Sequence, residues 1–136
     1  MRIVGCEILH CNAGWRDFSF LKLMTDENIT GISEYNECYG SPGLSGIIRR
    51  LVERVKDMDP LAHEHIHQCL YAATRQAPGG VNQQAIAAIE NALLDIKGQA
   101  LNIPVYDILG GAIRKEIPVY WSHCGTYICL LYTSDA

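Results

Sequence analysis

Apolar and polar positions alternate in three short runs near the start of the chain, at residues 2–12, 18–25 and 29–37. Such alternation is typical of strands with one buried face. A short polar turn at residues 26–28 separates the second and third runs, and this favours an antiparallel hairpin. The first 37 residues are therefore predicted to form a three-stranded antiparallel meander.

The pattern then becomes helical. Glycine, proline and serine dominate residues 40–46, which are predicted to form a loop because proline restricts φ and glycine relaxes it. Ser45 is expected to cap the helix that follows, whose apolar positions recur at steps of three and four through Val55. A second helix is predicted to start at Asp59-Pro60, with the proline in its first turn.

The strongest helical pattern covers about residues 82–101, where large aliphatic side chains recur at helical steps and alanines allow close packing. Pro104 ends this helix. A last apolar run at residues 117–124 is predicted to be another strand. Because strands and helices are segregated along the chain, the predicted fold class is α+β, with a meander followed by a helical bundle.

Composition narrows the class of protein. Of 136 residues, 49% are hydrophobic and 19% are charged, which is typical of a globular domain and not of a disordered chain. The net charge of -4 offers no general attraction for nucleic acid or an anionic membrane. No apolar run reaches the roughly 18 residues of a membrane-spanning helix, and residues 1–10 lack the pattern of a secretory signal. We therefore expect a cytoplasmic protein.

Six cysteines are spread along the chain without a CxxC pair or zinc-finger spacing. They are Cys6, Cys11, Cys38, Cys69, Cys124 and Cys129. Most lie in apolar stretches of a sequence without secretory features. We therefore expect reduced, mostly buried thiols that pack as small hydrophobic side chains.

A short histidine-rich segment matches the HExxH pattern of zinc proteases at His63, Glu64 and His67. In that pattern two histidines on one helix face bind zinc and the glutamate acts as a base. Glu90 lies downstream as a candidate third ligand. The competing interpretation is a solvated helix face, which is favoured because the motif opens near a predicted helix start and the chain leaves little room for a substrate cleft.

Two further features of the sequence are weaker candidates for a functional site. The glycines of residues 40–46 precede a helix, as in phosphate-binding loops, but they match neither a Walker loop nor GxGxxG, so a surface loop is favoured. Glu34 and Glu37 lie near a strand end, with Asp26 and Glu27 in the preceding turn. Taken alone, these carboxylates indicate a solvated edge or loop.

Residues 85–111 carry a more specific pattern and resemble the mandelate racemase/muconate lactonizing enzyme family of the enolase superfamily. In that family a helix of small residues with the pattern A-x-x-x-A-L-x-D-x-x-G precedes P-V-x-x-L-L-G-G, and both halves stand in register here. Residues 31–35 also resemble the third strand of the family. The resemblance covers about residues 1–127.

The resemblance implies an architecture, because the N-terminal domain of this family is a meander followed by helices that caps a (β/α) barrel. Residues 1–115 are then expected to be the capping domain, and residues 116–127 the first strand of a C-terminal barrel that the chain lacks. Residues 128–136 do not continue a barrel and resemble a translated read-through. We therefore expect a truncated or misassembled reading frame.

The resemblance also implies candidate site residues. The loops after the first and third strands, residues 11–17 and 36–44, are expected to close over the active site and exclude water. The loop side chains expected to contact substrate are Trp15, Arg16, Glu37 and Tyr39. At the end of the first barrel strand, Ser122 and His123 resemble contacts to a substrate carboxylate. A packed strand-end histidine is the alternative for His123.

The chemistry implied by the resemblance is proton abstraction beside a carboxylate, with Mg²⁺ stabilising the enediolate. The bases and metal ligands of the family lie on later barrel strands, so no catalytic or metal-binding residue is expected in this chain, and Mg²⁺ is expected only for the full-length enzyme. The implied enzyme is a lyase or isomerase, either an acid-sugar dehydratase or a racemase or cycloisomerase.

The resemblance further implies a small carboxylate or sugar-acid substrate, a homo-oligomer, and no nucleic-acid or membrane partner. The chain as written is expected to be inactive. The open alternative is a free-standing α+β domain with a non-catalytic binding role, and a zinc protease is a distant third.

Overall fold

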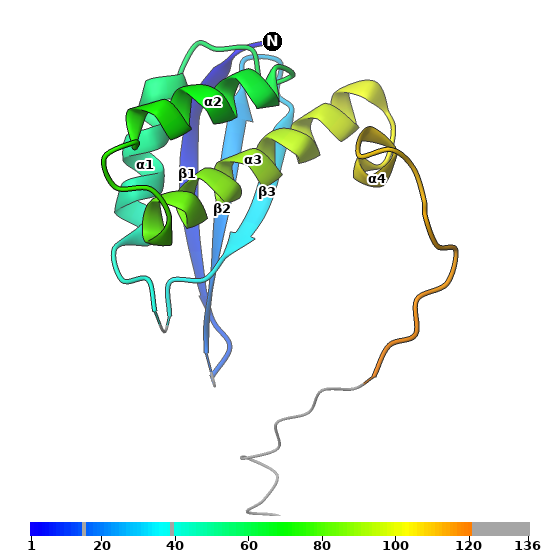
Figure 1. The fold of residues 1–136 in the computed structure, drawn as a ribbon, viewed down its shortest axis with the longest axis horizontal. Coiled ribbons are helices and arrows are strands. Elements are labelled where there is room, and N and C mark those ends of the chain that lie inside the picture. The colour runs from blue at the N-terminus through cyan, green and yellow to red at the C-terminus, as the bar shows by residue number, and fades with distance from the viewer. Residues whose placement is uncertain (15, 39, 121–136) are drawn as a thin grey trace, which may run out of the picture.

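A three-stranded antiparallel sheet opens the chain in the computed structural model, which describes residues 1–14, 16–38 and 40–120. The strands are β1 (Ile3–Asn12), β2 (Asp17–Thr25) and β3 (Thr30–Tyr35). Their order across the sheet is β1-β2-β3, and both pairings are antiparallel (Figure 1). The predicted meander is confirmed, with strand ends within two residues of the expected ones.

The register of the sheet places one face of β2 in the core. Leu21 pairs with Ile8 on one side and Ser33 on the other, and Leu23 pairs with Cys6. Both leucines are completely buried. The opposite face is partly open to solvent, as expected for an antiparallel sheet covered by helices on one side only.

Four helices follow the sheet in the described part of the chain. They are α1 (Leu44–Val55), α2 (His63–Ala73), α3 (Gly80–Leu101) and the short α4 (Val105–Ile108). The three long helices cover one face of the sheet, and α3 crosses it diagonally (Figure 1). Helix α3 packs on β3 and β2, α1 packs on β1 and α3, and α2 packs on α3 and α1. The predicted α+β class and the segregation of strands from helices are therefore confirmed.

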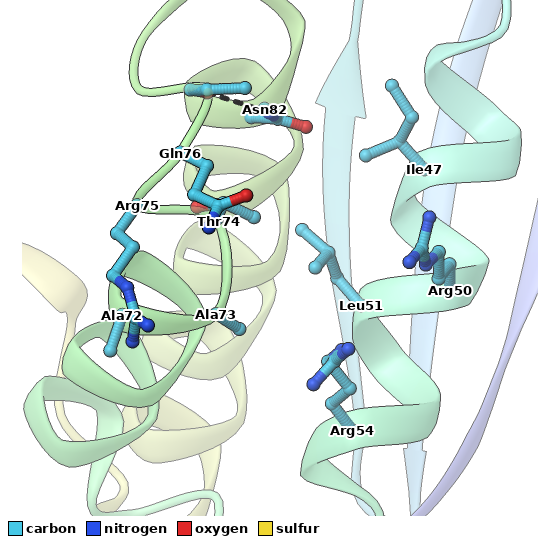
Figure 2. Close-up of a pocket in the computed structure, with 11 residues that line it drawn as sticks. Ile47, Arg50, Leu51, Arg54, Ala72, Ala73, Thr74, Arg75, Gln76 and Asn82 are labelled. Carbon is cyan, nitrogen blue, oxygen red and sulfur yellow. Dashed lines mark hydrogen bonds between the residues drawn. The ribbon is translucent and has the colours of Figure 1, made fainter.

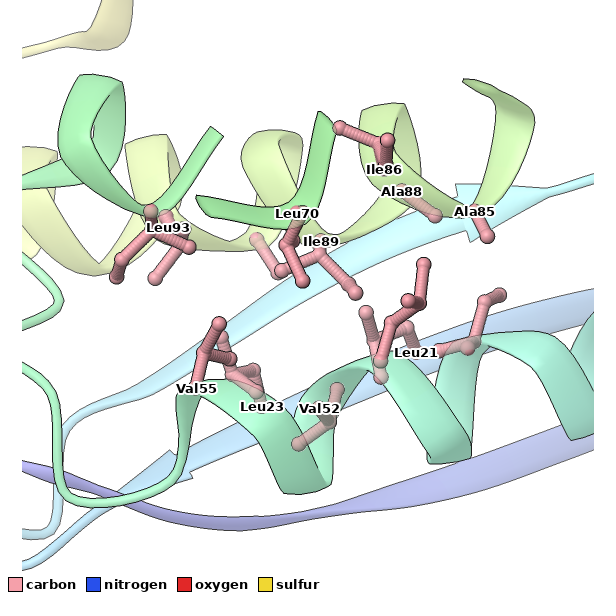
Figure 3. Close-up of a cluster of buried hydrophobic side chains, with 14 of the residues drawn as sticks. Leu21, Leu23, Val52, Val55, Leu70, Ala85, Ile86, Ala88, Ile89 and Leu93 are labelled. Carbon is pink, nitrogen blue, oxygen red and sulfur yellow. The ribbon is translucent and has the colours of Figure 1, made fainter. Parts of the chain in front are cut away.

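The hydrophobic core forms where β2 meets α1, α2 and α3, as Figure 3 shows. Each large side chain buried there contributes about 1.5–3 kcal/mol relative to an exposed one. The largest completely buried side chains are Ile3, Leu21, Leu23, Leu44, Ile48, Ile66, Leu70, Ile86, Ile89, Leu93, Ile96 and Val52. The buried aliphatic positions of α1 and α3 follow the apolar periodicity of the sequence, whereas on α2 only Ile66 and Leu70 are buried.

Helix α3 approaches β3 so closely that no side chain fits between them at one point. A Cβ atom added to Gly31 would overlap the carbonyl oxygen of Ala92 and crowd Ile96. Further along α3, a Cβ on Gly98 would lie 3.0 Å from the carbonyl oxygen of Ile103. Small residues at these positions therefore let α3 contact both the sheet and the turn that follows the helix.

Side chains of α3 also bind the outer edge of the sheet. The backbone N–H of Ile32 donates to Oδ2 of Asp95 (2.8 Å), and Nε2 of Gln99 donates to the carbonyl oxygen of Thr30 (2.8 Å). An edge strand otherwise exposes unpaired N–H and C=O groups. The alanine and aspartate of the A-L-x-D-x-x-G pattern thus pack α3 on β3, and its glycine lets the turn after α3 lie close to the helix.

Two predicted helix starts are wrong. The residue that precedes α1 is Gly43, in a left-handed conformation (φ 85°), and Ser45 is buried in the first turn, where its hydroxyl bonds Glu37 instead of capping. Helix α2 begins at His63 and not at Asp59. The Asp59 carboxylate accepts from the N–H of Leu61 (3.0 Å), which makes a local turn that competes with helix.

The cysteines are less buried than expected. Among the described residues, Cys11, Cys38 and Cys69 are exposed, Cys6 is partly buried, and all four are free thiols. Cys11 lies on the open face of the sheet opposite Phe18, and Cys69 lies on the outer side of α2. Cys124 and Cys129 lie outside the described residues.

The predicted strand at residues 117–124 is absent over 117–120, the part that the structure describes. This segment runs away from α4 beside no described strand, so its backbone has no partner with which to form a ladder (Figure 1). None of the described helices is long and apolar enough to cross a membrane.

Candidate functional site

The two connections expected to form a lid lie at the same end of the sheet (Figure 1). The pair Asn12 and Asp17 closes the β1–β2 hairpin, and Ser19 with Tyr35 is the last pair of β2 and β3. The hairpin therefore extends beyond the end of β3, and the connection from β3 to α1 leaves at that same end. Chain order and register bring these connections together.

Arg16 lies just before β2 and is held against the open face of the sheet. Its Nη2 atom lies 2.9 Å from Oε1 of Glu34 on β3, and its guanidinium carbon lies 4.0 Å from the centre of the Phe18 ring. An ion pair and a cation–π contact together restrict the orientation of the guanidinium group. Arg16 therefore couples the hairpin end to β3.

Glu37 follows β3 and binds the first turn of α1. Its carboxylate accepts from the backbone N–H of Ser45 (3.2 Å) and from the Ser45 hydroxyl. The same hydroxyl hydrogen-bonds the hydroxyl of Tyr35 (2.6 Å). The interpretation as a solvated edge or loop is wrong for Glu37, which is partly buried and bonded to Ser45, but it holds for Glu34, whose side chain is 50% exposed.

These contacts determine the ionisation of Glu37. Burial opposes the charged form, but hydrogen bonds from Ser45, the backbone N–H of Gly43 and the charge of His10 outweigh it, so the pKa of Glu37 is lowered. Burial raises the pKa of the neighbouring Tyr35. The pair therefore consists of an ionised carboxylate and a neutral phenol that share one serine hydroxyl.

Glu37 also lines a polar cavity of about 460 Å³ between the hairpin and the start of α1. The other lining residues are His10, Asp17, Ser19, Cys38 and Ser45. Nδ1 of His10 lies 3.1 Å from Oγ of Ser19, and Sγ of Cys38 lies 3.5 Å from the carbonyl oxygen of Asp17. Such a cavity offers both donors and acceptors to a hydroxylated ligand.

Sequence reasoning did not identify His10, Asp17 or Ser19 as site residues. The pairing of the first two strands could have revealed two of them, because His10 and Ser19 lie directly opposite each other on β1 and β2. Of the two predicted site residues that the structure describes, Glu37 lines this cavity, whereas Arg16 points to the open face of the sheet. Trp15, Tyr39, Ser122 and His123 lie outside the described residues.

The HExxH segment lies in the contact between α2 and α3. Nδ1 of His67 lies 2.9 Å from Oε2 of Glu90, and Nδ1 of His63 accepts from the ammonium group of Lys97 (3.3 Å). The two imidazoles are only 13% and 23% exposed for His63 and His67 respectively, so the expectation of a solvated face is wrong for both. Spacing of four residues directs them toward α3 together.

Metal binding requires several ligands that converge. Within residues 1–14, 16–38 and 40–120, no group of three or more histidine, cysteine, aspartate or glutamate side chains could hold a metal ion. The donors of the HExxH segment are already bonded across the helix contact. The described part of the chain therefore fits neither the zinc site of a protease nor a Mg²⁺ site.

The curated proteins that the chain resembles include D-galactonate dehydratases. It is 35% identical over 127 residues to D-galactonate dehydratase of Xanthomonas axonopodis pv. citri, a match that covers 88% of this chain and 31% of that protein. It is 39% identical over 108 residues to D-galactonate dehydratase of Pectobacterium atrosepticum, covering 74% of this chain and 26% of that protein. The chain thus spans about a third of the length of these relatives or less.

Solved structures share the fold. A protein from Burkholderia xenovorans strain LB400, provisionally assigned as an L-alanine-DL-glutamate epimerase, superposes with a TM-score of 0.88 at 47% identity over 93% of this chain and 32% of its own. A second structure with that assignment was solved with magnesium and fumarate bound (TM-score 0.87, 48% identity, 92% of this chain and 31% of its own).

A member of the enolase superfamily from Salmonella Typhimurium superposes with a TM-score of 0.77 at 32% identity, over 83% of this chain and 30% of its own. The family model described as mandelate racemase / muconate lactonizing enzyme, N-terminal domain, matches residues 11–110, which include the end of β1, the strands β2 and β3, the three long helices and the turn after them. The chain therefore belongs to the mandelate racemase/muconate lactonizing enzyme family of the enolase superfamily, and these residues form its N-terminal domain.

Proposed function

We propose that this chain is the substrate-capping part of an enzyme that removes a proton beside the carboxylate of a sugar acid, as an acid-sugar dehydratase or a related racemase or cycloisomerase. The observation that carries the proposal is the 35% identity to D-galactonate dehydratase over 127 residues, nearly the whole chain. The joint position of the two connections at one end of the sheet supports a capping role.

In this proposal the chain contributes substrate selection and exclusion of water. Glu37 anchors the connection after β3 to α1, and Arg16 anchors the hairpin end to β3. Trp15 and Tyr39, which belong to the same two connections in the sequence, are the proposed substrate contacts. Ser122 and His123 are the proposed contacts at the first barrel strand.

The cofactor and the catalytic groups belong to the full-length enzyme. Mg²⁺ would stabilise the negative charge that develops on the substrate carboxylate. The described residues offer no ligand group for this ion, so no catalytic step is assigned to them. We propose a cytoplasmic homo-oligomer as the functional form.

A chimeric enzyme tests the capping role. Residues 1–127 of this chain replace the matching segment of the Xanthomonas axonopodis D-galactonate dehydratase, and dehydration of a panel of sugar acids is measured with Mg²⁺. We expect turnover by the chimera, and none by this chain alone or by the relative without its N-terminal segment. A folded chimera without activity on any sugar acid would favour a free-standing binding domain, and turnover by this chain alone would contradict the proposal.

A second arm of the experiment tests the proposed contacts. Replacement of Trp15 by alanine in the chimera is expected to raise KM or change the preferred sugar acid. The matched control is Tyr71→Ala, because Tyr71 is an exposed aromatic residue on α2, far in the chain from either connection. Equal effects of the two substitutions would argue against a substrate contact at Trp15.

A further inference from the structure

A second cavity lies among the helices, away from the sheet. Its volume is about 470 Å³, and it lies between α1 on one side and the end of α2 with the start of α3 on the other (Figure 2). Ile47, Leu51, Ala72 and Ala73 supply apolar lining. None of its lining residues is shared with the cavity around Glu37.

Three arginines line this cavity from two sides. Arg50 and Arg54 come from successive turns of α1, and Arg75 comes from the segment after α2 (Figure 2). No acidic residue lines the cavity. Within the described part of the chain, none of the three guanidinium groups takes part in a hydrogen bond or an ion pair. This is a concentration of unneutralised positive charge on a protein of net charge -4.

Interactions with helix dipoles account for two of these three arginines but not for the third. Arg54 lies in the last turn of α1, and Arg75 follows α2, where each interacts favourably with a helix dipole. Arg50 lies in the middle of α1, four residues before Arg54, and like charges at this spacing destabilise a helix. A bound anion would remove this repulsion.

Two of the other polar side chains of the lining are engaged within the protein, so the guanidinium groups are the main donors available to a ligand. Nδ2 of Asn82 donates to the carbonyl oxygen of Ala77 (2.8 Å), and the Thr74 hydroxyl donates to the carbonyl oxygen of Leu70 (3.0 Å). The amide of Gln76 also lines the cavity. Guanidinium groups bind phosphate and carboxylate oxygens through paired N–H donors. A volume in this range fits a small molecule and exceeds what a single inorganic ion fills.

We propose that this cavity binds a small polyanion that carries two or more phosphate or carboxylate groups. The apolar residues pack against the body of the ligand, and Arg50, Arg54 and Arg75 neutralise its charged ends. Because the ligand bridges α1 and the segment after α2, its binding stabilises the folded domain. The site does not depend on the proposed enzymatic function.

Binding can be measured on the full chain by calorimetric titration and by thermal unfolding, with inorganic pyrophosphate and citrate as probes and sodium chloride at matched ionic strength. We expect saturable binding of at least one probe, with a melting temperature that rises with its concentration. Binding of pyrophosphate alone identifies a phosphate ligand, and binding of citrate alone identifies a polycarboxylate.

Substitution distinguishes this site from general charge attraction. Arg54→Gln and Arg75→Gln are each expected to weaken binding about fivefold or more, as loss of a charge-assisted hydrogen bond at a solvent-exposed site would do. Arg49→Gln is the matched control, because Arg49 is an exposed arginine of the same helix that does not line the cavity. The proposal is overturned if neither probe binds saturably, if sodium chloride gives the same stabilisation, or if Arg49→Gln weakens binding as much as Arg54→Gln.

Discussion

Glu37 binds the first turn of α1 from outside the helix. The first N–H groups of any helix lack partners within it, and a carboxylate near them is favoured by the helix dipole. Here Glu37 accepts from the N–H of Ser45 and from its hydroxyl. One side chain therefore satisfies the helix start and restrains the connection that is proposed to cap a substrate.

The lowered pKa of Glu37 predicts a pH-dependent contribution to stability. A carboxylate whose pKa is lower in the folded than in the unfolded state stabilises the fold above its unfolded pKa, and this contribution is lost as the pH falls through the folded pKa. Glu37→Gln should therefore unfold at a lower temperature than the parent chain at neutral pH. The difference in melting temperature should shrink as the pH falls below about 4.3, the ordinary pKa of a glutamate, and then through the lower pKa of the folded carboxylate.

Thermal unfolding between neutral and acidic pH measures this effect. Glu53→Gln is the control, because Glu53 is an exposed carboxylate of α1 without a hydrogen bond or ion pair to the described residues. If the melting temperatures of Glu37→Gln and the parent chain differed by the same amount at every pH, an ionic role for Glu37 would be contradicted.

Gly31 is the residue at which α3 and β3 touch. A Cβ atom there would overlap backbone of α3, which cannot move without displacing the helix. Gly31→Ala is therefore expected to lower the free energy of unfolding by about 1–3 kcal/mol or more, as overpacking of a core does. Denaturant unfolding of the parent chain and of Gly31→Ala measures this difference in the free energy of unfolding.

Replacement of Gly46 by alanine is expected to change the free energy of unfolding in the opposite direction. Gly46 lies in α1, is exposed, and has open space where a Cβ would be placed. Gly46→Ala should raise the free energy of unfolding by about 0.5–1 kcal/mol, because alanine favours helix. If both alanine substitutions had the same sign, the close approach of α3 to β3 would be in doubt.

At the scale of elements, polar pairs join α2 to α3. His67 bonds Glu90, His63 accepts from Lys97, and the rings of His67 and Tyr71 stack with their centres 6.4 Å apart. The spacing that produces the HExxH pattern also directs both histidines to the neighbouring helix. In this structure the pattern serves helix packing.

This packing role predicts that zinc does not stabilise the fold. The ligand atoms are engaged across the helix contact, and the described residues include no group of three ligands. The measurement is the melting temperature with and without Zn²⁺. The His67→Ala variant should have a lower melting temperature than the parent chain under both conditions. A rise in melting temperature with Zn²⁺ that disappears in His67→Ala would restore the metal-site hypothesis.

At the scale of the whole molecule, apolar side chains remain uncovered along the segment after α3. Leu109 is exposed, and Ile113, Val119 and Tyr120 are 97%, 88% and 87% exposed. An exposed apolar surface of this kind marks a contact with another protein segment or a tendency to aggregate. Ile113, Val119 and Tyr120 lie beyond residues 11–110, which the family model matches.

Removal of this segment is expected to improve solubility. A chain that ends at Lys115 loses Ile117, Val119 and Tyr120, none of which packs on the core. Size-exclusion chromatography of both chains at equal concentration should give a higher monomer fraction for the shortened one. An equal monomer fraction would mean that the segment is covered in solution, and the interpretation of it as an unpaired barrel strand would fail.

Local patterns in the sequence predict most of the elements but not all of their ends. The alternation of residues 2–37 and the helical spacing of α3 correspond closely to the observed bounds, because both depend on neighbours within one element. Ser45 and Asp59 were misassigned at helix starts, since a serine or aspartate bonds whichever partner lies nearest in space. The exposure of Cys11 and Cys69 was missed for a similar reason, because it depends on which face is covered.

By itself, the sequence determined the fold class, the core-facing positions and the family, because periodicity and the pattern of residues 85–111 are local properties of the chain. Only the tertiary structure decided that Glu37 meets Ser45 and that His67 meets Glu90. It also decided that three arginines line one cavity. These contacts join residues that lie on separate elements, and their geometry follows from how α1, α2 and α3 pack on the sheet and on one another.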